Sequence, residues 1–532
     1  MKKNLVSSLF LILLIMTIAQ ADSNISNIPH LQKMGSSTEL MVHNKPFLIL
    51  GGELNNSSSS SLVYVAPIFQ QLAESHLNTV LTPIAWDLIE PKENQFDFHL
   101  FDGLIDLARK DNLHLVLLWL ASWKNGMSSY QPSWVKRQYK RFPLVRDGEG
   151  HPRAILSAFA KSNYEADANA FAHLMAHLKA VDEKQQTVVM IQVENEVGIL
   201  NDSRDRSPLA NAAFAKPVPE ALINRLKSGT VPELNAIWVK SGSKTQGDWS
   251  EVFGSGPTTD EIFMAWHYAR YLDHVAATGK KEYPIPMYAN AWLDGDGAKP
   301  GNYPSGCPEA HLLDVWQVGA PNLNLLAPDL YASNFQERCE LYTRQGNTLF
   351  IPEMNSREGG AENMFYAIGT KNALGTSPFG IDRMTPDSPV AKSYALLSQI
   401  ARQILEHRGQ DQVIGFVLDQ QHPQVEKIMG GCKVEISLDE IFGHTAQQGH
   451  GIVIATGDGH FLGAGQGFRV LFQPLHTPGE RIGINLVQEG KFEDGKWVGG
   501  RYLNGDETDQ GRSWRFAFWA PSISKCSVYR FK

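Results

Sequence analysis

Between residue 46 and about residue 408, short apolar runs rich in β-branched residues alternate with longer amphipathic stretches. The short runs are typical of buried strands, and the longer stretches repeat apolar residues at helical spacing, as Phe101, Leu104 and Ala108 do. The expected strands are Phe47–Leu54, Asn78–Pro83, Leu113–Leu120, Thr187–Val193, Ile285–Ala289, Leu325–Tyr331, Thr348–Pro352 and Ser377–Ile381. The expected helices include Leu62–His76, Phe101–Asn112, Asn163–Asp182, Asp260–Thr278, Asn334–Gln345 and Val390–His407.

The order of these elements predicts a closed parallel barrel. Eight strands that mostly alternate with helices are typical of a (β/α)8 TIM barrel. The alternative is an open, doubly wound parallel sheet. The dinucleotide-binding form of that sheet carries a GxGxxG motif after its first strand, and the chain has no such motif there. We therefore expect an α/β fold in which residues 22–408 form the barrel.

Beyond His407 the pattern changes to short apolar runs that are separated by turns of Gly, Asp and Pro. This spacing predicts an antiparallel β-sandwich over residues 409–532. The expected strands are Val413–Leu418, Cys432–Ser437, Gly451–Thr456, His460–Gly465, Phe468–Gln473, Arg481–Glu489, Lys496–Tyr502, Trp514–Ala520 and Ser527–Phe531.

The first 21 residues have the features of a secretory signal peptide. Lys2 and Lys3 give a positive start, an apolar run follows, and Ala19 and Ala21 are small residues suited to cleavage. The apolar run is shorter than the roughly 20 residues that span a bilayer, so a membrane anchor is the weaker alternative. The sequence therefore predicts an exported protein, periplasmic or extracellular, with no membrane span in its mature chain.

The formal net charge of −8 at pH 7 argues against a nucleic-acid partner, because phosphate groups are neutralised by clustered Lys and Arg. The four cysteines leave two possibilities open. Export permits the disulfides Cys307–Cys339 and Cys432–Cys526, and four free buried thiols fit the sequence equally well. The chain has neither a CxxC motif nor the ligand spacing of a zinc site, so no metal is expected.

Two glutamates follow expected strands four and seven. Glu196 ends the run Gln-Val-Glu-Asn-Glu, and Glu353 follows Pro352. Strand ends of this kind meet at the C-terminal mouth of a barrel, where strands four and seven face each other. Cleavage of a sugar acetal needs a carboxylic acid and a carboxylate, roughly 5–5.5 Å apart in a retaining enzyme. We therefore expect Glu196 as acid/base and Glu353 as nucleophile, with no organic cofactor.

These motifs resemble those of glycoside hydrolase family 35, the β-galactosidases. The resemblance rests on Gln192–Glu196, on Gly51–Asn55 in the first strand and on Leu118–Asn125 in the third, and it extends over nearly all of the mature chain. The C-terminal β-domain is similar to that of a bacterial branch of the family. The resemblance implies a retaining exo-β-galactosidase that releases terminal, non-reducing β-D-galactose by double displacement, for example from xyloglucan side chains.

Further residues at strand ends are expected to line a sugar pocket, with an ordinary structural role as the alternative for each. The amide of Asn195 suits the hydroxyl beside the anomeric carbon, and the hydroxyl of Tyr331 is placed to hold Glu353. Glu53 is expected to accept sugar hydroxyls, and Trp123 to stack on the sugar ring. The other residues of the expected substrate-binding set are Asn55, Lys124 and Asn125.

Two insertions, Ser122–Phe159 and Val197–Thr258, follow expected strands three and four, and we expect them to form the walls of an exo-acting pocket. The second insertion shows little periodicity. Asn290 and Trp292 end strand five and are expected to contact the leaving group. The same catalytic residues serve a glycosidase of another sugar, an arabinofuranoside or a glucoside, and a non-catalytic carbohydrate-binding protein is a further alternative. The sequence carries no signal for the oligomeric state.

Overall fold

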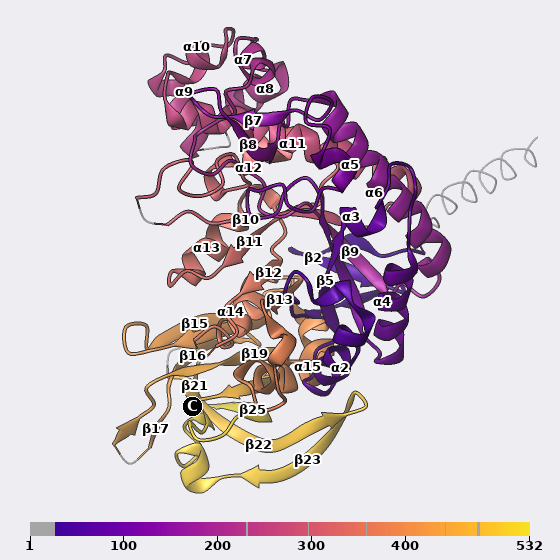
Figure 1. The fold of residues 1–532 in the computed structure, drawn as a ribbon. Coiled ribbons are helices and arrows are strands. Elements are labelled where there is room, and N and C mark those ends of the chain that lie inside the picture. Colours follow the sequence, from indigo (N-terminus) through magenta and orange to yellow (C-terminus); the bar gives the residue numbers. More distant parts are fainter. Residues whose placement is uncertain (1–26, 230–231, 296, 358, 442, 476–478) are drawn as a thin grey trace, which may run out of the picture.

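The computed structural model describes residues 27–229, 232–295, 297–357, 359–441, 443–475 and 479–532. The expected signal peptide at residues 1–21 lies outside the described residues. The described chain forms a barrel that is followed by a smaller body of antiparallel sheets (Figure 1). Among the described residues, no helix combines the length and the apolar character that crossing a membrane requires.

The first body is built on a parallel eight-stranded sheet that closes on itself. Its strands follow chain order around the barrel, and the hydrogen bonds from Leu81 N to Gly52 O (2.9 Å) and from Leu54 N to Leu81 O (3.1 Å) join the first strand to the second. The predicted (β/α)8 barrel is therefore confirmed. The strands are β4 (Ile49–Leu50), β5 (Thr79–Ala85), β6 (His114–Leu120), β9 (Val188–Val193), β10 (Met287–Trp292), β11 (Leu325–Leu330), β12 (Ile351–Met354) and β13 (Gly375–Pro378).

Helices cover the outside of the barrel and bury their apolar faces against it. The last of them begins at a Ser388 cap whose hydroxyl accepts from Ala391 N, with Pro389 in the first turn, where proline costs no hydrogen bond. The helices are α2 (Leu62–Glu74), α3 (Trp86–Ile89), α4 (His99–Lys110), α6 (Lys161–Asp182), α11 (Pro257–Glu282), α12 (Leu313–Gly319), α13 (Phe335–Tyr342), α14 (Asn363–Gly369) and α15 (Pro389–His407).

The eighth strand lies earlier in the chain than the expected Ser377–Ile381. Gly380 has a φ of +71°, in the left-handed region where a strand cannot continue. The short 3-10 helix η4 (Ile381–Arg383) follows, so the predicted bounds of this strand were wrong.

A small antiparallel sheet, which the sequence analysis did not predict, closes the N-terminal end of the barrel. Leu40 and Val42 of this sheet pack with Ile49 and other apolar residues of the barrel strands. The buried pair of Arg408 and Glu39, with Nε to Oε1 at 2.7 Å, ties the sheet to the end of α15. The strands are β1 (His30–Met34), β2 (Ser37–Val42) and β3 (Lys45–Phe47).

The second insertion is largely helical, although its sequence shows little periodicity. Its helices are short and rely on side-chain caps, such as Ser207 at α7 and the reciprocal pair of Asp248 and Glu251 at α10. The helices are α7 (Pro208–Phe214), α8 (Glu220–Lys227), α9 (Pro232–Lys240) and α10 (Trp249–Phe253). The first insertion contains helix α5 (Ser133–Lys136) and the strands β7 (Leu144–Arg146) and β8 (Pro152–Leu156).

The second body is an antiparallel β-sandwich, as predicted. A six-stranded and a four-stranded sheet enclose an aromatic core in which the rings of Phe468 and Phe516 stack at 4.2 Å. The strands are β14 (Val413–Leu418), β15 (Gln424–Met429), β16 (Cys432–Leu438), β17 (Glu440–Ile441), β18 (His444–Thr445), β19 (Gly449–Gly457), β20 (His460–Gln466), β21 (Phe468–Gln473), β22 (Arg481–Glu493), β23 (Lys496–Leu503), β24 (Trp514–Phe516) and β25 (Ser522–Phe531). The four cysteines are free, buried thiols, which is the second of the two alternatives.

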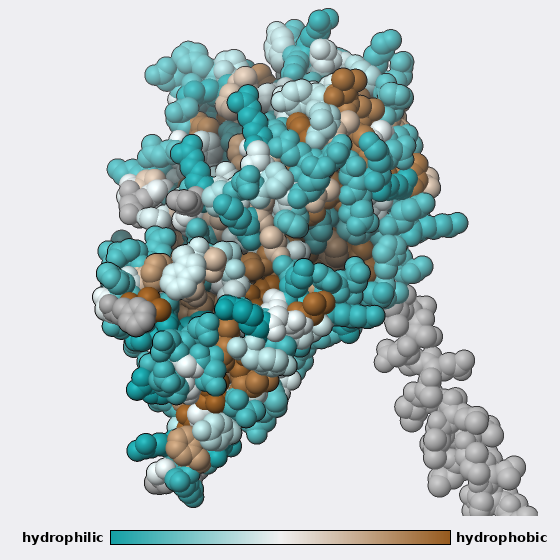
Figure 2. Space-filling model, turned by 90° about the horizontal axis from the view of Figure 1, so that it is seen from below, coloured by the Kyte–Doolittle hydropathy of each residue, from teal (hydrophilic) through white to brown (hydrophobic). Residues whose placement is uncertain are grey.

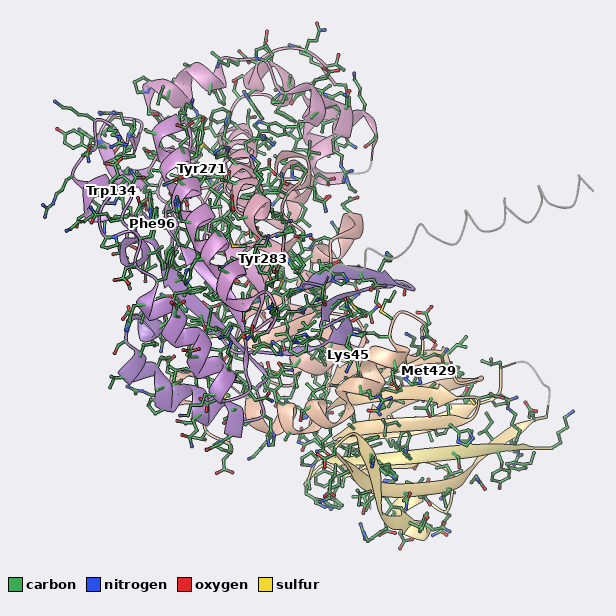
Figure 3. The ribbon with its side chains drawn as sticks, turned by 90° about the vertical axis from the view of Figure 1, so that its right-hand side faces the viewer. Lys45, Phe96, Trp134, Tyr271, Tyr283 and Met429 are labelled. Atoms are coloured by element: carbon green, nitrogen blue, oxygen red, sulfur yellow. The ribbon has the colours of Figure 1, made fainter. Side chains whose placement is uncertain are left out.

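The sandwich packs against the last two helices of the barrel. Ile452, Leu462 and Ile523 of the sandwich belong to the same apolar cluster as the barrel helices. Gly369 of α14 lies so close to Gly415 of β14 that an added Cβ on Gly369 would stand 2.6 Å from the Cα of Gly415. The two bodies are therefore joined by apolar packing without a linker, and Figure 3 shows them side by side.

Candidate active site

Four buried carboxyl groups meet at the C-terminal mouth of the barrel: those of Glu53, Glu196, Asp329 and Glu353, each at most 5% exposed. One oxygen from each of Glu196, Asp329 and Glu353 lies within 4.8 Å of the other two. Carboxyl groups this close and this buried cannot all be ionised, because like charges raise each other's pKa. By spacing alone these three could hold a metal ion, but the ammonium group of Lys124 already provides a positive charge beside them.

Glu353 lies on β12, opposite Asp329 of the neighbouring β11. Its Oε2 accepts a hydrogen bond of 2.8 Å from the hydroxyl of Tyr331, as the sequence analysis expected. Its Oε1 has no hydrogen-bond partner among the described residues. One oxygen is thus fixed and the other is left to a reactant.

Glu196 sits on a strained turn directly after β9. Glu194 and Glu196 both have left-handed backbones, with φ of +61° and +44°, a conformation that costs non-glycine residues energy and recurs at functional sites. The turn is held by its neighbours, since Glu196 N donates to Asn290 Oδ1 at 2.9 Å and Gly126 N donates to Glu196 O at 3.0 Å. The surroundings therefore dictate where this carboxyl group points.

Asn125 binds the Glu196 carboxyl group directly. Its Nδ2 donates to Glu196 Oε2 at 2.5 Å. Asn125 and Gly126 form a two-residue turn with φ of +52° and +66°, closed by hydrogen bonds between Lys124 and Met127 in both directions. Such a type I′ turn favours the Asn-Gly pair, which is what the sequence contains.

The pKa values of the carboxyl groups are displaced upward. Burial, followed by the charge of Glu353, raises the pKa of Glu196 to about 7, against the lowering effects of Lys124 and Asn125. Burial and the charge of Glu353 also hold the pKa of Glu53 and of Asp329 well above their usual values. Glu196 therefore carries a proton up to neutral pH, as a general acid requires.

Lys124 and Asn195 form a second pair in the mouth. Lys124 Nζ donates to Asn195 Oδ1 at 2.9 Å, and the amide Nδ2 of Asn195 is buried without a partner among the described residues. Burial lowers the pKa of Lys124, but the charges of Glu353, Glu53 and further carboxylates outweigh it, so the net shift is upward. Lys124 is therefore a permanent cation in an acidic pocket.

Two expected substrate-binding residues lie elsewhere. The ring of Trp123 is fully buried against Tyr268 and Tyr271, with centroid distances of 5.1 and 4.6 Å, so its assignment as a sugar-stacking surface was wrong. It is part of the barrel core, and Figure 3 shows Tyr271 among the helices. The side chain of Asn55 donates to Asp382 Oδ2 at 2.9 Å, which fastens the loop after β4 to η4 and does not place Asn55 with the carboxyl cluster.

Three functional residues were missed or misjudged from the sequence. Asp329 points into the mouth because it lies two residues before Tyr331, on the same side of an extended segment. Asn290 accepts from Glu196 N and donates to Asp329 Oδ2, so it also positions two of the carboxyl groups. Glu194 accepts from the backbone of Ser122 and Trp123 and fixes the third-strand loop.

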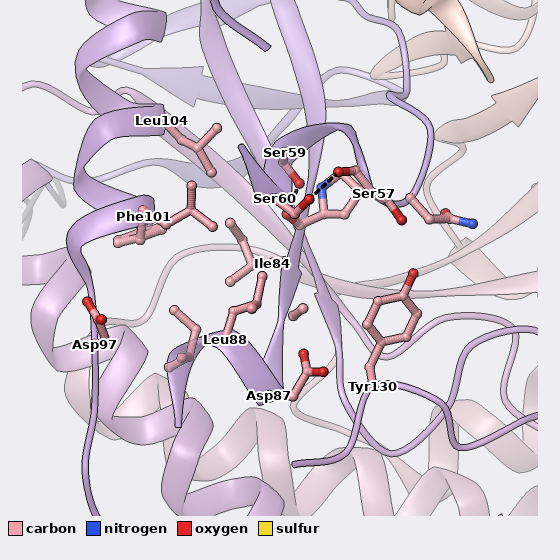
Figure 4. Close-up of a pocket in the computed structure, with 15 residues that line it drawn as sticks. Ser57, Ser59, Ser60, Ile84, Asp87, Leu88, Asp97, Phe101, Leu104 and Tyr130 are labelled. Atoms are coloured by element: carbon pink, nitrogen blue, oxygen red, sulfur yellow. Dashed lines mark hydrogen bonds between the residues drawn. The ribbon is translucent and has the colours of Figure 1, made fainter. Parts of the chain in front are cut away.

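A small cavity of about 160 Å³ lies beside the mouth, between the loop after β4 and helices α3 and α4 (Figure 4). Its lining includes Ser57, Asp87 and Tyr130, and Ser60 Oγ donates to Ser57 O at 2.6 Å along its rim. The four carboxyl groups are not among its lining residues. This cavity is therefore distinct from the candidate active site.

Two family models match the chain. Residues 64–274, which include Glu196, match the glycoside hydrolase family 42 model, described as beta-galactosidase. Residues 390–515, which cover α15 and most of the sandwich, match a model described only as a domain of unknown function. The expected resemblance to β-galactosidases is thus confirmed, although the matching model is not that of family 35.

Two relatives have related descriptions. The chain is 28% identical to human beta-galactosidase-1-like protein 3 over 205 residues, which are 35% of this chain and 28% of the relative. It is 23% identical to a beta-galactosidase of Xanthomonas manihotis over 251 residues, 44% of this chain and 39% of that protein. The chain thus spans well under half of either relative. Among solved structures, the beta-galactosidase of Bacillus circulans sp. alkalophilus aligns with a TM-score of 0.48 at 16% identity, over 68% of this chain and 57% of that one.

The matched segment contains the turn that carries Glu196, and Glu353 completes the carboxyl pair from the opposite side of the same mouth. Over the segment that carries Glu196, the barrel of this chain is therefore similar to the family model described as beta-galactosidase.

Proposed function

We propose that the chain is a retaining exo-β-galactosidase. The observation that carries the proposal is the carboxyl pair of Glu196 and Glu353, whose nearest oxygens lie within 4.8 Å on facing strands of the barrel. Retaining glycosidases need carboxyl groups roughly 5–5.5 Å apart, whereas inverting enzymes need roughly 6.5–9.5 Å to admit a water molecule. The spacing therefore favours retention.

The two carboxyl groups have different protonation states for the first step. Glu353, held by Tyr331, attacks the anomeric carbon with its unpartnered Oε1. Glu196 gives its proton to the glycosidic oxygen, the C–O bond breaks, and a galactosyl ester of Glu353 forms. In the second step Glu196, now a carboxylate, takes a proton from water as the water oxygen displaces Glu353. Both residues return to their starting states.

Buried polar atoms without protein partners supply the sugar contacts. Both oxygens of Glu53 and the Nδ2 of Asn195 lack hydrogen bonds within the described residues, and such groups are costly unless a ligand completes them. Hydroxyl groups of a sugar donate to Glu53 and accept from Asn195. Galactose is the preferred sugar because the matching family model is that of β-galactosidases. Both insertions lie at this end of the barrel, where they limit the pocket to a terminal residue.

The test uses purified mature protein with an aryl β-D-galactoside, the matching glucoside and the matching α-L-arabinofuranoside. We expect galactoside turnover that falls at least 10³-fold in Glu353→Ala and is unchanged in Glu149→Ala, a control at an exposed surface glutamate. Proton NMR during turnover is expected to show β-galactose before its α-anomer. Turnover of another isomer alone refutes the substrate, and initial release of α-galactose refutes the mechanism.

We also propose xyloglucan side chains as the source of the galactose, and export of the protein through cleavage after Ala21. The first is checked by galactose release from galactosylated xyloglucan. The second is checked by N-terminal sequencing of the protein recovered from outside the cytoplasm, where a mature chain beginning at Asp22 is expected.

A further inference from the structure

Two adjacent aromatic side chains stand out from the surface of the sandwich. Phe518 and Trp519, in the loop between β24 and β25, are 40% and 66% exposed. Their rings touch edge to face with centroids 5.0 Å apart. The surface seen from the side of the sandwich is largely hydrophilic, with apolar side chains in patches between (Figure 2). Exposed aromatic pairs of this kind commonly mark a binding site.

Each ring borders a separate hollow. Phe518 lines a hollow of about 660 Å³ whose other lining residues are Asp419 and the glutamines at 420, 421, 447, 448 and 466. Trp519 lines a second hollow of about 550 Å³ beside Arg501 and Arg515. Both volumes are in the range of sites that take small ligands or single units of a chain. The aromatic pair therefore separates two polar hollows that lie next to each other.

The chemistry of both hollows fits a neutral, hydroxyl-rich chain. Amide groups donate to and accept from hydroxyl groups, and five of the seven residues that line the first hollow are glutamines. In the second hollow, Arg501 is paired with Glu489, and Arg515 with Asp439 at 2.9 and 3.0 Å, so neither guanidinium is free to attract an anion. The apolar C–H faces of a pyranose ring pack well on aromatic rings.

The first hollow lies at the end of the sandwich that is on the same side as the mouth of the barrel. β14 and β19 run antiparallel, with Val417 opposite His450 and Gly415 opposite Ile452. The ring of His450 lies 5.1 Å from that of Phe365 in the first turn of α14, whereas Gly415 meets Gly369 at the end of that helix. A barrel helix starts at the C-terminal mouth and runs away from it. The sandwich end that carries the glutamine-lined hollow therefore lies on the catalytic side of the molecule.

We propose that the loop of Phe518 and Trp519, with the two hollows beside it, is a docking site for a neutral polysaccharide chain, separate from the carboxyl cluster. The proposal rests on the proposed glycosidase function for its purpose: a chain held on the sandwich keeps its side branches near the mouth. Its occupant is an internal stretch of a glycan, whereas the barrel takes a terminal sugar.

The test is native electrophoresis of the full chain in gels that contain galactosylated xyloglucan, with heparin gels as the anionic comparison. All proteins carry Glu353→Ala, so that the glycan in the gel is not degraded. We expect retardation by xyloglucan and none by heparin. The double variant Phe518→Ala/Trp519→Ala is expected to lose at least fivefold in affinity. The control Tyr529→Ala/Phe531→Ala removes two exposed aromatics at the far end of β25, the strand that follows the loop, and is expected to bind as the parent does.

Equal retardation of the parent and the Phe518/Trp519 variant overturns the proposal, as does the absence of retardation in xyloglucan gels. In the active chain, the double variant is expected to hydrolyse a small aryl galactoside at the normal rate. An equal loss on that substrate would mean that the loop acts through the barrel, which also overturns the proposal. Aromatic-dependent retardation by a chain that cleaves no glycoside leaves the docking site standing and refutes only the proposed hydrolase.

Discussion

The hydroxyl of Tyr331 lies 2.8 Å from Oε2 of Glu353 and donates a hydrogen bond to it from the neighbouring strand end. This bond fixes the carboxylate and shares its charge, and hydrogen bonds to charged groups contribute about 1.5–3 kcal/mol. Tyr331→Phe is therefore expected to lower kcat by about 10–100-fold while leaving thermal stability unchanged, since the side chain is half exposed. Steady-state kinetics with an aryl galactoside provide the measurement, and an unaltered kcat would contradict the role of this bond.

The pH dependence is expected to follow Glu196. Burial and Glu353 raise its pKa to about 7, so the protonated acid is present below pH 7 and is lost as the pH rises through that value. The rate on substrates with poor leaving groups is expected to fall above pH 7. Asn125 lowers the pKa of Glu196 through its hydrogen bond, so Asn125→Ala is expected to move this fall to higher pH. A pH profile of kcat/KM for both proteins checks the direction, and a shift to lower pH would refute it.

The ionised Glu53 side chain is expected to lower the stability of the fold, although it contributes to sugar binding. Burial, and then Glu353, raise its pKa in the folded state. A raised carboxyl pKa means that the folded state binds more protons than the unfolded state, so stability falls as the pH rises above the unfolded value near 4.3. Glu53→Gln is therefore expected to raise the free energy of unfolding by about 1–3 kcal/mol at pH 8, with a smaller gain at pH 5. Thermal unfolding of both proteins at the two pH values is the measurement.

The same Glu53→Gln variant is expected to lose at least tenfold in kcat/KM for the galactoside, because the amide of Gln has one oxygen that accepts hydrogen bonds where the carboxyl group has two. Glu149→Gln, at an exposed site, is the control for both measurements. A variant that is less stable than the parent at both pH values would show that Glu53 supports the fold.

Trp123→Ala is expected to act on folding. The ring is fully buried against Tyr268 and Tyr271, and truncation of a buried tryptophan costs about 3–5 kcal/mol. Urea unfolding is the measurement, with the exposed Trp519→Ala as a control that changes stability by less than about 0.5 kcal/mol. If Trp123→Ala had normal stability and a raised KM, Trp123 would be a substrate-binding residue and not a core residue.

Much of the fold and the centre of the site could be predicted from the sequence. Buried strands and amphipathic helices alternate regularly along the chain. Eight such strand–helix units are compatible with few folds, and the closed parallel barrel is one of them. The closeness of Glu196 and Glu353 could be predicted because the topology brings the ends of strands four and seven together, whatever the details of the loops. Tyr331 followed from its position beside strand seven.

The errors have physical causes. Trp123 was placed in the pocket because an aromatic residue after a strand fits a sugar site and a barrel core equally well, and only the packing of Tyr268 and Tyr271 decides between them. Asn55 was expected in the pocket because it is a polar residue at the end of the first strand. Its side chain instead binds Asp382, which lies more than 300 residues later in the chain, and such a contact leaves no local signal in the sequence. The helices of the second insertion were missed because they are too short to show a clear periodicity. Side-chain caps help to stabilise α7 and α10.

The contact of Gly369 with Gly415 limits where the chain can be cut into separate parts. The helices α14 and α15 lie in the barrel and also form the support on which the sandwich rests, so they belong to two cores at once. A chain cut after residue 408 exposes a broad apolar surface of the barrel, and a transplanted sandwich carries the complementary surface with nothing to cover it. Each half is therefore expected to need the other to cover its apolar surface, and a chain cut at this point is expected to aggregate.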